Sequence, residues 1–199
     1  MRIVVKFGGT SVRTPARLRL AARNILALRA RGDGIVTSAI EHPAVLATCA
    51  ALAAEGFRVT HVPVDGQGHV QPAALAAALD EGTILVSIMH ANNETGVLQP
   101  LAELAALTRA RGIVLHTDAV QTAGKVTLLP DLAGADLITL SGHKLYGPKG
   151  IGVLVARAGT PLLPVNAGGG QERGRRPGTE NVAALPGPAA APELRNWGP

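Results

Sequence analysis

Three segments of this 199-residue chain place polar side chains directly after a run of apolar residues. Each run is typical of a buried strand, and the side chains that follow are of the kinds that bind ligands or transfer protons. They are Asn92 and Asn93 after the run at 83–89, the segment HTDAVQ at 116–121 after 113–115, and the segment SGHK at 141–144 after 136–140. A lysine amine among carboxyl, amide, hydroxyl and imidazole groups indicates covalent chemistry on a carbonyl compound.

The same set meets the needs of an enzyme that uses pyridoxal 5′-phosphate (PLP). Such an enzyme needs a lysine that holds the aldehyde as a Schiff base, an acid near the pyridine nitrogen, donors for the phosphate and a flat group against the ring. Lys144 can be that lysine, and Asp118 can keep the ring nitrogen protonated. The other roles fall to Gln121 at the ring hydroxyl, Ser141 and His143 at the phosphate, and His42, after the run 35–37, against the ring face.

Each of these residues also has a plain structural interpretation. Lys144 can be an ordinary exposed lysine, and Asp118 can be a helix N-cap. His42 precedes Pro43 and can belong to the start of a helix, while His143 can be a partly buried histidine with a hydrogen-bond partner. Their joint occurrence after successive strands is what favours a cofactor site.

Alternating strands and helices position these segments. Apolar runs predict strands at 2–7, 35–37, 58–62, 83–89, 113–117, 136–141 and 152–155. Helical patterns lie at 15–31, 43–55, 72–79 and 101–111. This alternation predicts an α/β fold with a mainly parallel sheet and helices on both faces, and ligands then bind at the carboxyl ends of the strands.

Composition excludes several classes of protein. Hydrophobic residues make up 47% of the chain and aromatic residues 2%, so Ala, Leu and Val must build the core. The net charge of +5 comes from arginines spread along helices without interleaved aromatic residues, so we expect no nucleic-acid binding. The single cysteine, Cys49, excludes an internal disulfide framework and a cysteine-rich metal site, and we expect no metal. No signal peptide or membrane-spanning run is recognisable, so we expect a cytoplasmic protein.

Five motifs in order resemble the cysteine desulfurases of the class-V aminotransferase group. They are IVTSAIEHPAV at 35–45, MHANNETG at 89–96, HTDAVQ at 116–121, SGHKLYGPKG at 141–150 and GGGQERGRRPGTEN at 168–181. The resemblance runs from about residue 35 to about residue 184. It implies the large domain of fold-type I PLP enzymes, here incomplete.

The resemblance also implies a role for each site residue. Lys144 would form the Schiff base with PLP, and Lys144 and His42 would be the catalytic proton carriers. Asp118, Gln121 and Asn93 would lie at the ring, and Ser141, Gly142 and His143 at the phosphate. Thr179 would reach the phosphate of a second subunit, which implies a homodimer. The implied reaction converts L-cysteine to L-alanine and leaves enzyme-bound sulfur for iron–sulfur cluster or thio-cofactor assembly, with sulfur-acceptor or scaffold proteins as partners.

One element of that reaction is not found in the sequence. A thiolate must attack the substrate sulfur, yet Cys49 lies on the apolar run of a helix and is expected to be a core residue. The nucleophilic cysteine loop expected beyond the lysine is not in this chain, so we expect a truncated desulfurase with little or no activity. A PLP-binding or partner-binding module without catalysis is the alternative.

The first residues resemble a different family. MRIVVKFGGTSV at 1–12, followed by a helix, is similar to the start of an aspartate kinase, in which Lys6, Gly8 and Gly9 would approach ATP and Ser11 the amino-acid substrate. A fragment of such a kinase is therefore a further alternative. We also consider that the turn at 8–11 replaces a phosphate-binding turn of the desulfurase. The resulting division is a kinase-like segment at 1–33, a PLP-binding domain at 34–185 and an unstructured tail at 186–199.

Overall fold

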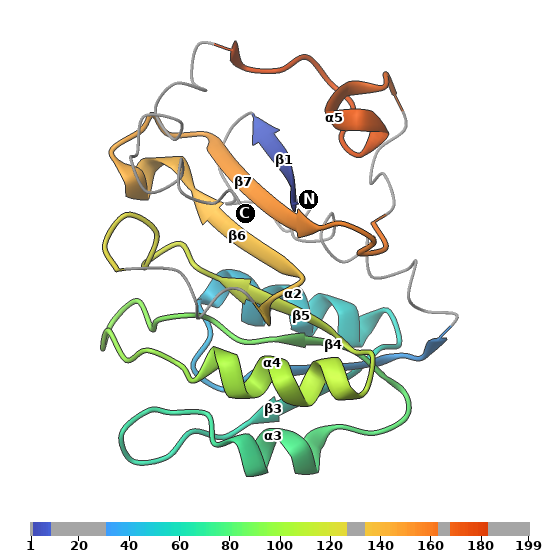
Figure 1. The fold of residues 1–199 in the computed structure, drawn as a ribbon, viewed down its shortest axis with the longest axis vertical. Coiled ribbons are helices and arrows are strands. Elements are labelled where there is room, and N and C mark those ends of the chain that lie inside the picture. The colour runs from blue at the N-terminus through green and yellow to red at the C-terminus, as the bar shows by residue number, and fades with distance from the viewer. Residues whose placement is uncertain (1, 9–30, 127–133, 163–167, 183–199) are drawn as a thin grey trace.

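The computed structural model describes residues 2–8, 31–126, 134–162 and 168–182. These residues form one sheet with the strand order β1-β7-β6-β5-β4-β2-β3 (Figure 1). The strands are β1 (Arg2–Gly8), β2 (Gly34–Ser38), β3 (Arg58–Val62), β4 (Thr83–Ser87), β5 (Val114–Asp118), β6 (Leu137–Ser141) and β7 (Ile151–Arg157).

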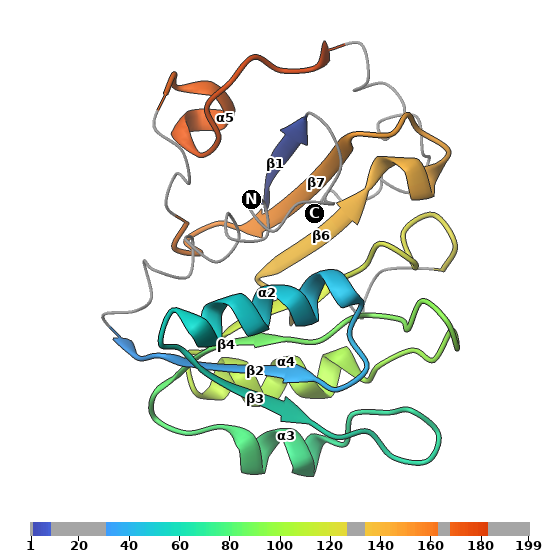
Figure 2. The same ribbon diagram turned by 180° about the vertical axis from the view of Figure 1, so that it is seen from behind.

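Most of this sheet is parallel. β3, β2, β4, β5 and β6 run parallel to their neighbours, which confirms the predicted fold class. β7 is antiparallel to both β6 and β1, so β1 runs in the same direction as β6. Figure 2 shows the arrowheads of β2, β3 and β6 pointing to the same side of the molecule. The carboxyl ends of the parallel strands therefore share one edge of the sheet.

Helices cover both faces of the sheet, as predicted. Helix α2 (Pro43–Ala54) lies on the face seen in Figure 2, whereas α3 (Pro72–Ala78) and α4 (Leu101–Ala110) lie on the face seen in Figure 1. From β2 the chain goes to β3 at one edge of the sheet, and it then returns past β2 to form β4 and β5 toward the other edge. Because crossovers between parallel strands are right-handed, the two directions place their helices on opposite faces.

The core consists of two apolar layers, one on each side of the sheet. Successive strand residues point to opposite faces, so Leu85 packs with Cys49 and Leu52 of α2 while Val86 packs with residues of α3 and α4. Every residue of β2 and β4 is buried, as expected for central strands covered on both faces. The edge strand β3 is exposed at Arg58, Thr60 and His61.

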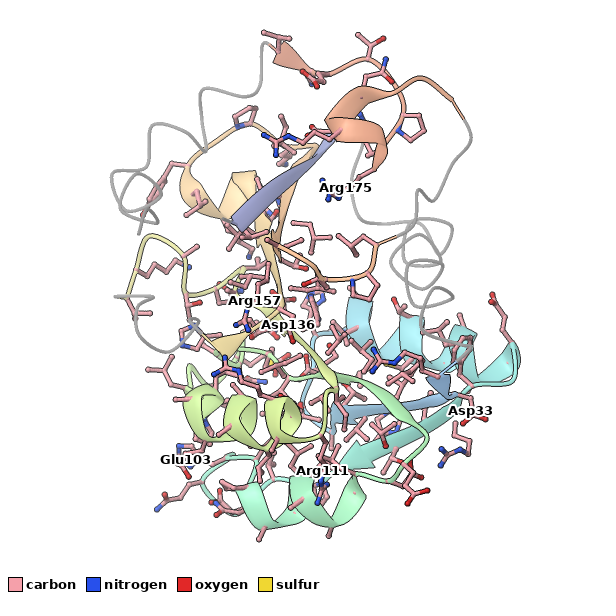
Figure 3. The ribbon with its side chains drawn as sticks, turned by 45° about the vertical axis from the view of Figure 1, so that its right-hand side comes forward. Asp33, Glu103, Arg111, Asp136, Arg157 and Arg175 are labelled. Carbon is pink, nitrogen blue, oxygen red and sulfur yellow. The ribbon has the colours of Figure 1, made fainter. Side chains whose placement is uncertain are left out.

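A polar cluster holds the amino end of β6 to its neighbours. Asp136 Oδ2 accepts the backbone N–H of Leu115 at 2.9 Å, and Asp136 Oδ1 lies 3.4 Å from Arg157 Nη1. The second guanidinium nitrogen, Arg157 Nη2, donates to the carbonyl of Ala135 at 3.2 Å. Figure 3 shows Asp136 and Arg157 beside each other. The cluster fixes the register of β5, β6 and β7 at the edge opposite the predicted site.

The observed elements agree with the predicted ones to within two residues at each end, although the sequence did not predict the antiparallel direction of β7. The predicted helix at 15–31 lies outside the described residues except for Arg31, and so does the tail at 186–199. The division into three segments stays a prediction, although β1 hydrogen-bonds to β7 in the same sheet as the rest. No helix among the described residues is long and apolar enough to cross a membrane.

Candidate active site

The polar segments lie where the parallel strands end. The loops concerned follow β2, β4, β5 and β6, and the chain reverses its direction of travel along the sheet between β2 and β4. In open α/β sheets, ligands bind in the crevice outside the strand ends at such a reversal. The site residues on these loops are His42, Asn93, Asp118, Gln121, Ser141, Gly142, His143 and Lys144.

His42 begins helix α2 and presents an exposed ring at this edge. Its Nδ1 accepts the backbone N–H of Ala44 at 3.1 Å, so the predicted role at the start of the helix is confirmed. Because Nδ1 accepts a hydrogen bond, a neutral ring carries its proton on Nε2. The cap therefore sets the orientation and the tautomer of the imidazole, while stacking on a cofactor stays a prediction.

Asp118 is the last residue of β5, and its Oδ1 accepts the N–H of Val120 at 2.9 Å. It thus caps a turn rather than a helix. Burial raises the pKa of Asp118, while the hydrogen bond from Val120 and the charge of His42 act in the opposite direction. The structure therefore brings Asp118 and His42 close enough to interact, although they are far apart in sequence.

The lysine segment forms a short 3-10 helix, η3 (Gly142–Leu145), directly after β6. Ser141 Oγ and His143 Nδ1 are 2.9 Å apart, so the two predicted phosphate donors lie together. Lys144 is exposed and Leu145 is buried. Leu145 packs against the turn that follows Asp118, where Gly124 has φ of +72° and an added Cβ would lie 2.9 Å from Leu145 Cδ2. This close approach fixes η3 against the loop after β5.

The two asparagines after β4 have different roles. Asn92 is structural, because its Oδ1 accepts the N–H groups of Glu94 and Thr95 and its Nδ2 donates to the carbonyl of Ile40. Asn93 lines an open depression that Gln121 also lines. The structure thus brings Asn93 and Gln121 to one surface, where Gln121 Oε1 accepts a hydrogen bond from Lys125 at 3.2 Å.

Glu41 is the site residue that sequence reasoning missed. It is 4% exposed, and it bonds to the ends of both β2 and β4. The sequence offered one signal, an acidic residue directly before His42 in an otherwise apolar segment. Glutamate is seldom fully buried without a partner, so sequence alone favours an exposed position.

Cys49 is a core residue, as predicted. It is 4% exposed among the apolar residues between α2 and the sheet. Burial, with a smaller contribution from the charge of Glu41, raises the pKa of its thiol to about 11. A buried thiol with a raised pKa holds almost no thiolate at neutral pH and cannot serve as a nucleophile.

Thr179 lies on a separate loop and is exposed. The loop follows the single turn α5 (Gln171–Gly174), in which Glu172 and Arg173 have φ values of +50° and +58°. Gln171 Oε1 accepts the N–H of Gly178 at 3.1 Å, which closes the loop on itself. The reach of Thr179 to the phosphate site of a second subunit stays a prediction.

The residues at this edge fit PLP by their chemistry. An exposed amine at Lys144, a half-buried carboxyl at Asp118 and the paired hydroxyl and imidazole of Ser141 and His143 lie at the neighbouring ends of β5 and β6. An aldehyde, a pyridine nitrogen and a phosphate require these three kinds of partner.

Comparison with known proteins gives the family. The family model described as aminotransferase class-V matches residues 8–197. The chain belongs to the class-V aminotransferase family. Like other members of this PLP-dependent family it has the fold-type I sheet.

Several curated relatives of this family member are named cysteine desulfurase. It is 46% identical over 192 residues to "Cysteine desulfurase IscS" of Dictyoglomus turgidum, which covers 96% of the chain and 48% of that protein. A solved "NifS-like protein" has a TM-score of 0.86 at 37% identity, covering 96% of this chain and 52% of that one. "SspA in complex with cysteine" has a TM-score of 0.82 at 34% identity, covering 94% and 54%. The chain spans about half the length of the curated relatives it matches.

These comparisons correct two predictions about the ends of the chain. The resemblance of residues 1–31 to an aspartate kinase is not supported, because the class-V match already begins at residue 8. The desulfurase resemblance was also placed too narrowly at 35–184, since the family match extends to residue 197. Of the residues assigned to ATP and aspartate binding, Gly9 and Ser11 lie outside the described residues, while Lys6 and Gly8 belong to β1.

The end of β1 bears on the phosphate-binding role considered for residues 8–11, of which only Gly8 is among the described residues. Gly8 pairs with Ile151, and the next residue of β7, Gly152, pairs with Ser141. The carboxyl end of β1 therefore lies two strands from Ser141, at the same edge as the lysine segment. A phosphate-binding role of Thr10 stays a prediction, since Thr10 itself lies outside the described residues.

Proposed function

We propose that this chain is the PLP-binding part of a cysteine desulfurase. The observation that carries the proposal is the placement, on adjacent strand ends, of the Lys144 amine, the Asp118 carboxyl and the Ser141–His143 pair. Relatives named cysteine desulfurase, at 46% identity over nearly the whole chain, support the reaction class.

Each side chain has a defined task in this proposal. Lys144 would hold PLP covalently through its ε-amino group, and Asp118 would face the pyridine nitrogen as an anion. Bound in this way, PLP supplies an electron sink for the bonds at the substrate α-carbon. The remaining contacts would be Gln121 at the ring hydroxyl, Asn93 at ring and substrate, His42 on the ring face, and Ser141, Gly142 and His143 at the phosphate.

Lys144 and His42 are the groups that would move protons. The Lys144 amine would accept and return a proton at the substrate. His42 exposes Nε2, because Nδ1 is engaged by the N–H of Ala44. The two groups come from different strand ends, which allows proton transfer at two positions of one substrate.

The substrate we propose is L-cysteine, with L-alanine and enzyme-bound sulfur as products. Cys49 is not the sulfur acceptor, because it is buried and its pKa is raised to about 11. The thiolate must therefore come from another thiol, on a longer form of the protein or on a partner. We further propose that the protein is a homodimer in which Thr179 reaches the phosphate site of the partner subunit. We propose a cytoplasmic location. We also propose that the enzyme-bound sulfur is delivered to scaffold or acceptor proteins for iron–sulfur cluster or thio-cofactor assembly.

Absorbance during PLP titration tests the cofactor. We expect the wild-type protein to develop a visible absorbance band that Lys144→Ala abolishes, because the band requires covalent attachment. Lys149→Ala is the matched control, since Lys149 is exposed on the same segment and has no assigned role. An unchanged band in Lys144→Ala, or no band in the wild type, would refute the proposal.

A further inference from the structure

Glu41 joins the two strand ends that flank the reversal in the sheet. Its Oε1 accepts the hydroxyl of Ser38 at 2.6 Å and the backbone N–H of Met89 at 2.8 Å. Ser38 is the last residue of β2, and Met89 lies two residues beyond β4. A single buried carboxyl group therefore fixes the positions from which the loops bearing His42 and Asn93 begin.

The other carboxyl oxygen is in a different environment. Glu41 Oε2 is buried and has no hydrogen-bond partner among the described residues. An ionised carboxylate would place negative charge on this oxygen without a donor, which is costly in a buried position. A protonated carboxyl carries an O–H there and keeps Oε1 as the acceptor of both observed bonds.

The neighbours of Glu41 also favour the protonated form. The charge of Asp118 from β5 acts on Glu41, and the charge of His42 acts in turn on Asp118. Glu41 itself acts on the thiol of Cys49 from α2. Burial raises the pKa of Glu41 to about 7, the charge of Asp118 adds to this, and the bonds from Ser38 and Met89 oppose it.

We propose that Glu41 is a positioning residue of this site, a neutral buried carboxyl that fixes the ends of β2 and β4 and places no second negative charge beside Asp118. Two neighbouring carboxyl groups that are shielded from water cannot both ionise without a large cost, so a proton on the buried Glu41 lowers the cost of a negative charge on the half-buried Asp118. The part of the inference that concerns Asp118 rests on the proposed function, in which that charge faces the ring nitrogen.

The first test uses the ligand-free protein and does not depend on the cofactor. The free energy of unfolding in urea is measured from about pH 5 to about pH 8 for the wild type and for Glu41→Gln, which keeps the acceptor oxygen but cannot ionise. The folded pKa lies above the ordinary value of 4.5, so the contribution of Glu41 is present at low pH and is lost as pH rises through about 7. We expect the stability of the wild type to fall relative to Glu41→Gln over this range.

Glu103→Gln on the exposed face of α4 is the control, and we expect it to leave the pH profile unchanged. A wild-type stability that rises relative to Glu41→Gln, or a difference that does not depend on pH, would overturn the neutral carboxyl.

The second test measures the dissociation constant of PLP from the Lys144-dependent absorbance. We expect Glu41→Gln to bind within about threefold of the wild type and Glu41→Ala to bind about tenfold more weakly, because alanine leaves the Ser38 hydroxyl and the Met89 N–H without their acceptor. Glu41→Ala with wild-type affinity would overturn the positioning role. Failure of every variant and of the wild type to bind PLP would refute the proposed function. The dependence of the free energy of unfolding on pH would still show whether Glu41 is protonated.

Discussion

Substitutions at His42 can separate its structural role from its proposed role at the cofactor. His42 accepts one backbone hydrogen bond as the N-cap of α2 and also presents its ring to the site. His42→Ala removes both functions. His42→Asn removes the ring but retains a side chain that is among the best N-caps.

The structure shows how much stability the cap contributes. Pro43 has no N–H, and the N–H groups of Val45 and Leu46 already bond to the carbonyl of His42, so only the N–H of Ala44 depends on the side chain. Loss of one such cap costs about 1 kcal/mol. In a chain of this size that corresponds to a decrease in Tm of about 2–4 °C.

Urea unfolding and PLP titration of the same two variants give the assay. We expect His42→Ala to lose about 1 kcal/mol of stability and His42→Asn to unfold like the wild type, while both lose PLP affinity to a similar extent. Equal destabilisation of the two variants would refute the cap. Wild-type PLP affinity in His42→Asn would refute the stacked ring.

Two further predictions concern residues outside the cofactor contacts. Cys49 should react with iodoacetamide at pH 8 only after unfolding in urea, because burial raises its pKa to about 11; rapid modification of the folded protein, read by mass spectrometry, would contradict this. Asp136→Ala should lower the free energy of unfolding by about 1–3 kcal/mol, because the N–H of Leu115 loses a partly buried acceptor and Arg157 loses one of its partners. Asp33→Ala is the control, because it removes the exposed ion pair with Arg58. An equal decrease in the free energy of unfolding for both variants would show that the partial burial of the Asp136 bonds does not make them more stabilising.

Much of the site could be predicted from the sequence because it depends on local order along the chain. An apolar run followed by polar residues marks the end of a buried strand, and parallel strands share the edge at which they end. Lys144, Asp118 and the Ser141–His143 pair were predicted in this way. The burial of Cys49 followed from the apolar helix around it.

Other features depend on contacts between segments that are far apart in sequence. Glu41 is paired through Met89, 48 residues away, so its sequence neighbourhood does not reveal that it is buried. Asn92 and Asn93 look equivalent in the sequence, yet a bond to Ile40 makes the first structural. The pairing of β1 with β7 places Gly8, the last residue of β1, at the edge that carries Ser141.

The sequence by itself determined which residues can do chemistry and which strands they follow, since residue type and hydrophobic period are local properties. Only the tertiary structure decided which of these groups share an environment. The pKa of a carboxyl depends on its burial and on its neighbours in space, so the raised pKa values of Glu41 and Asp118 follow from the packing of β2, β4 and β5.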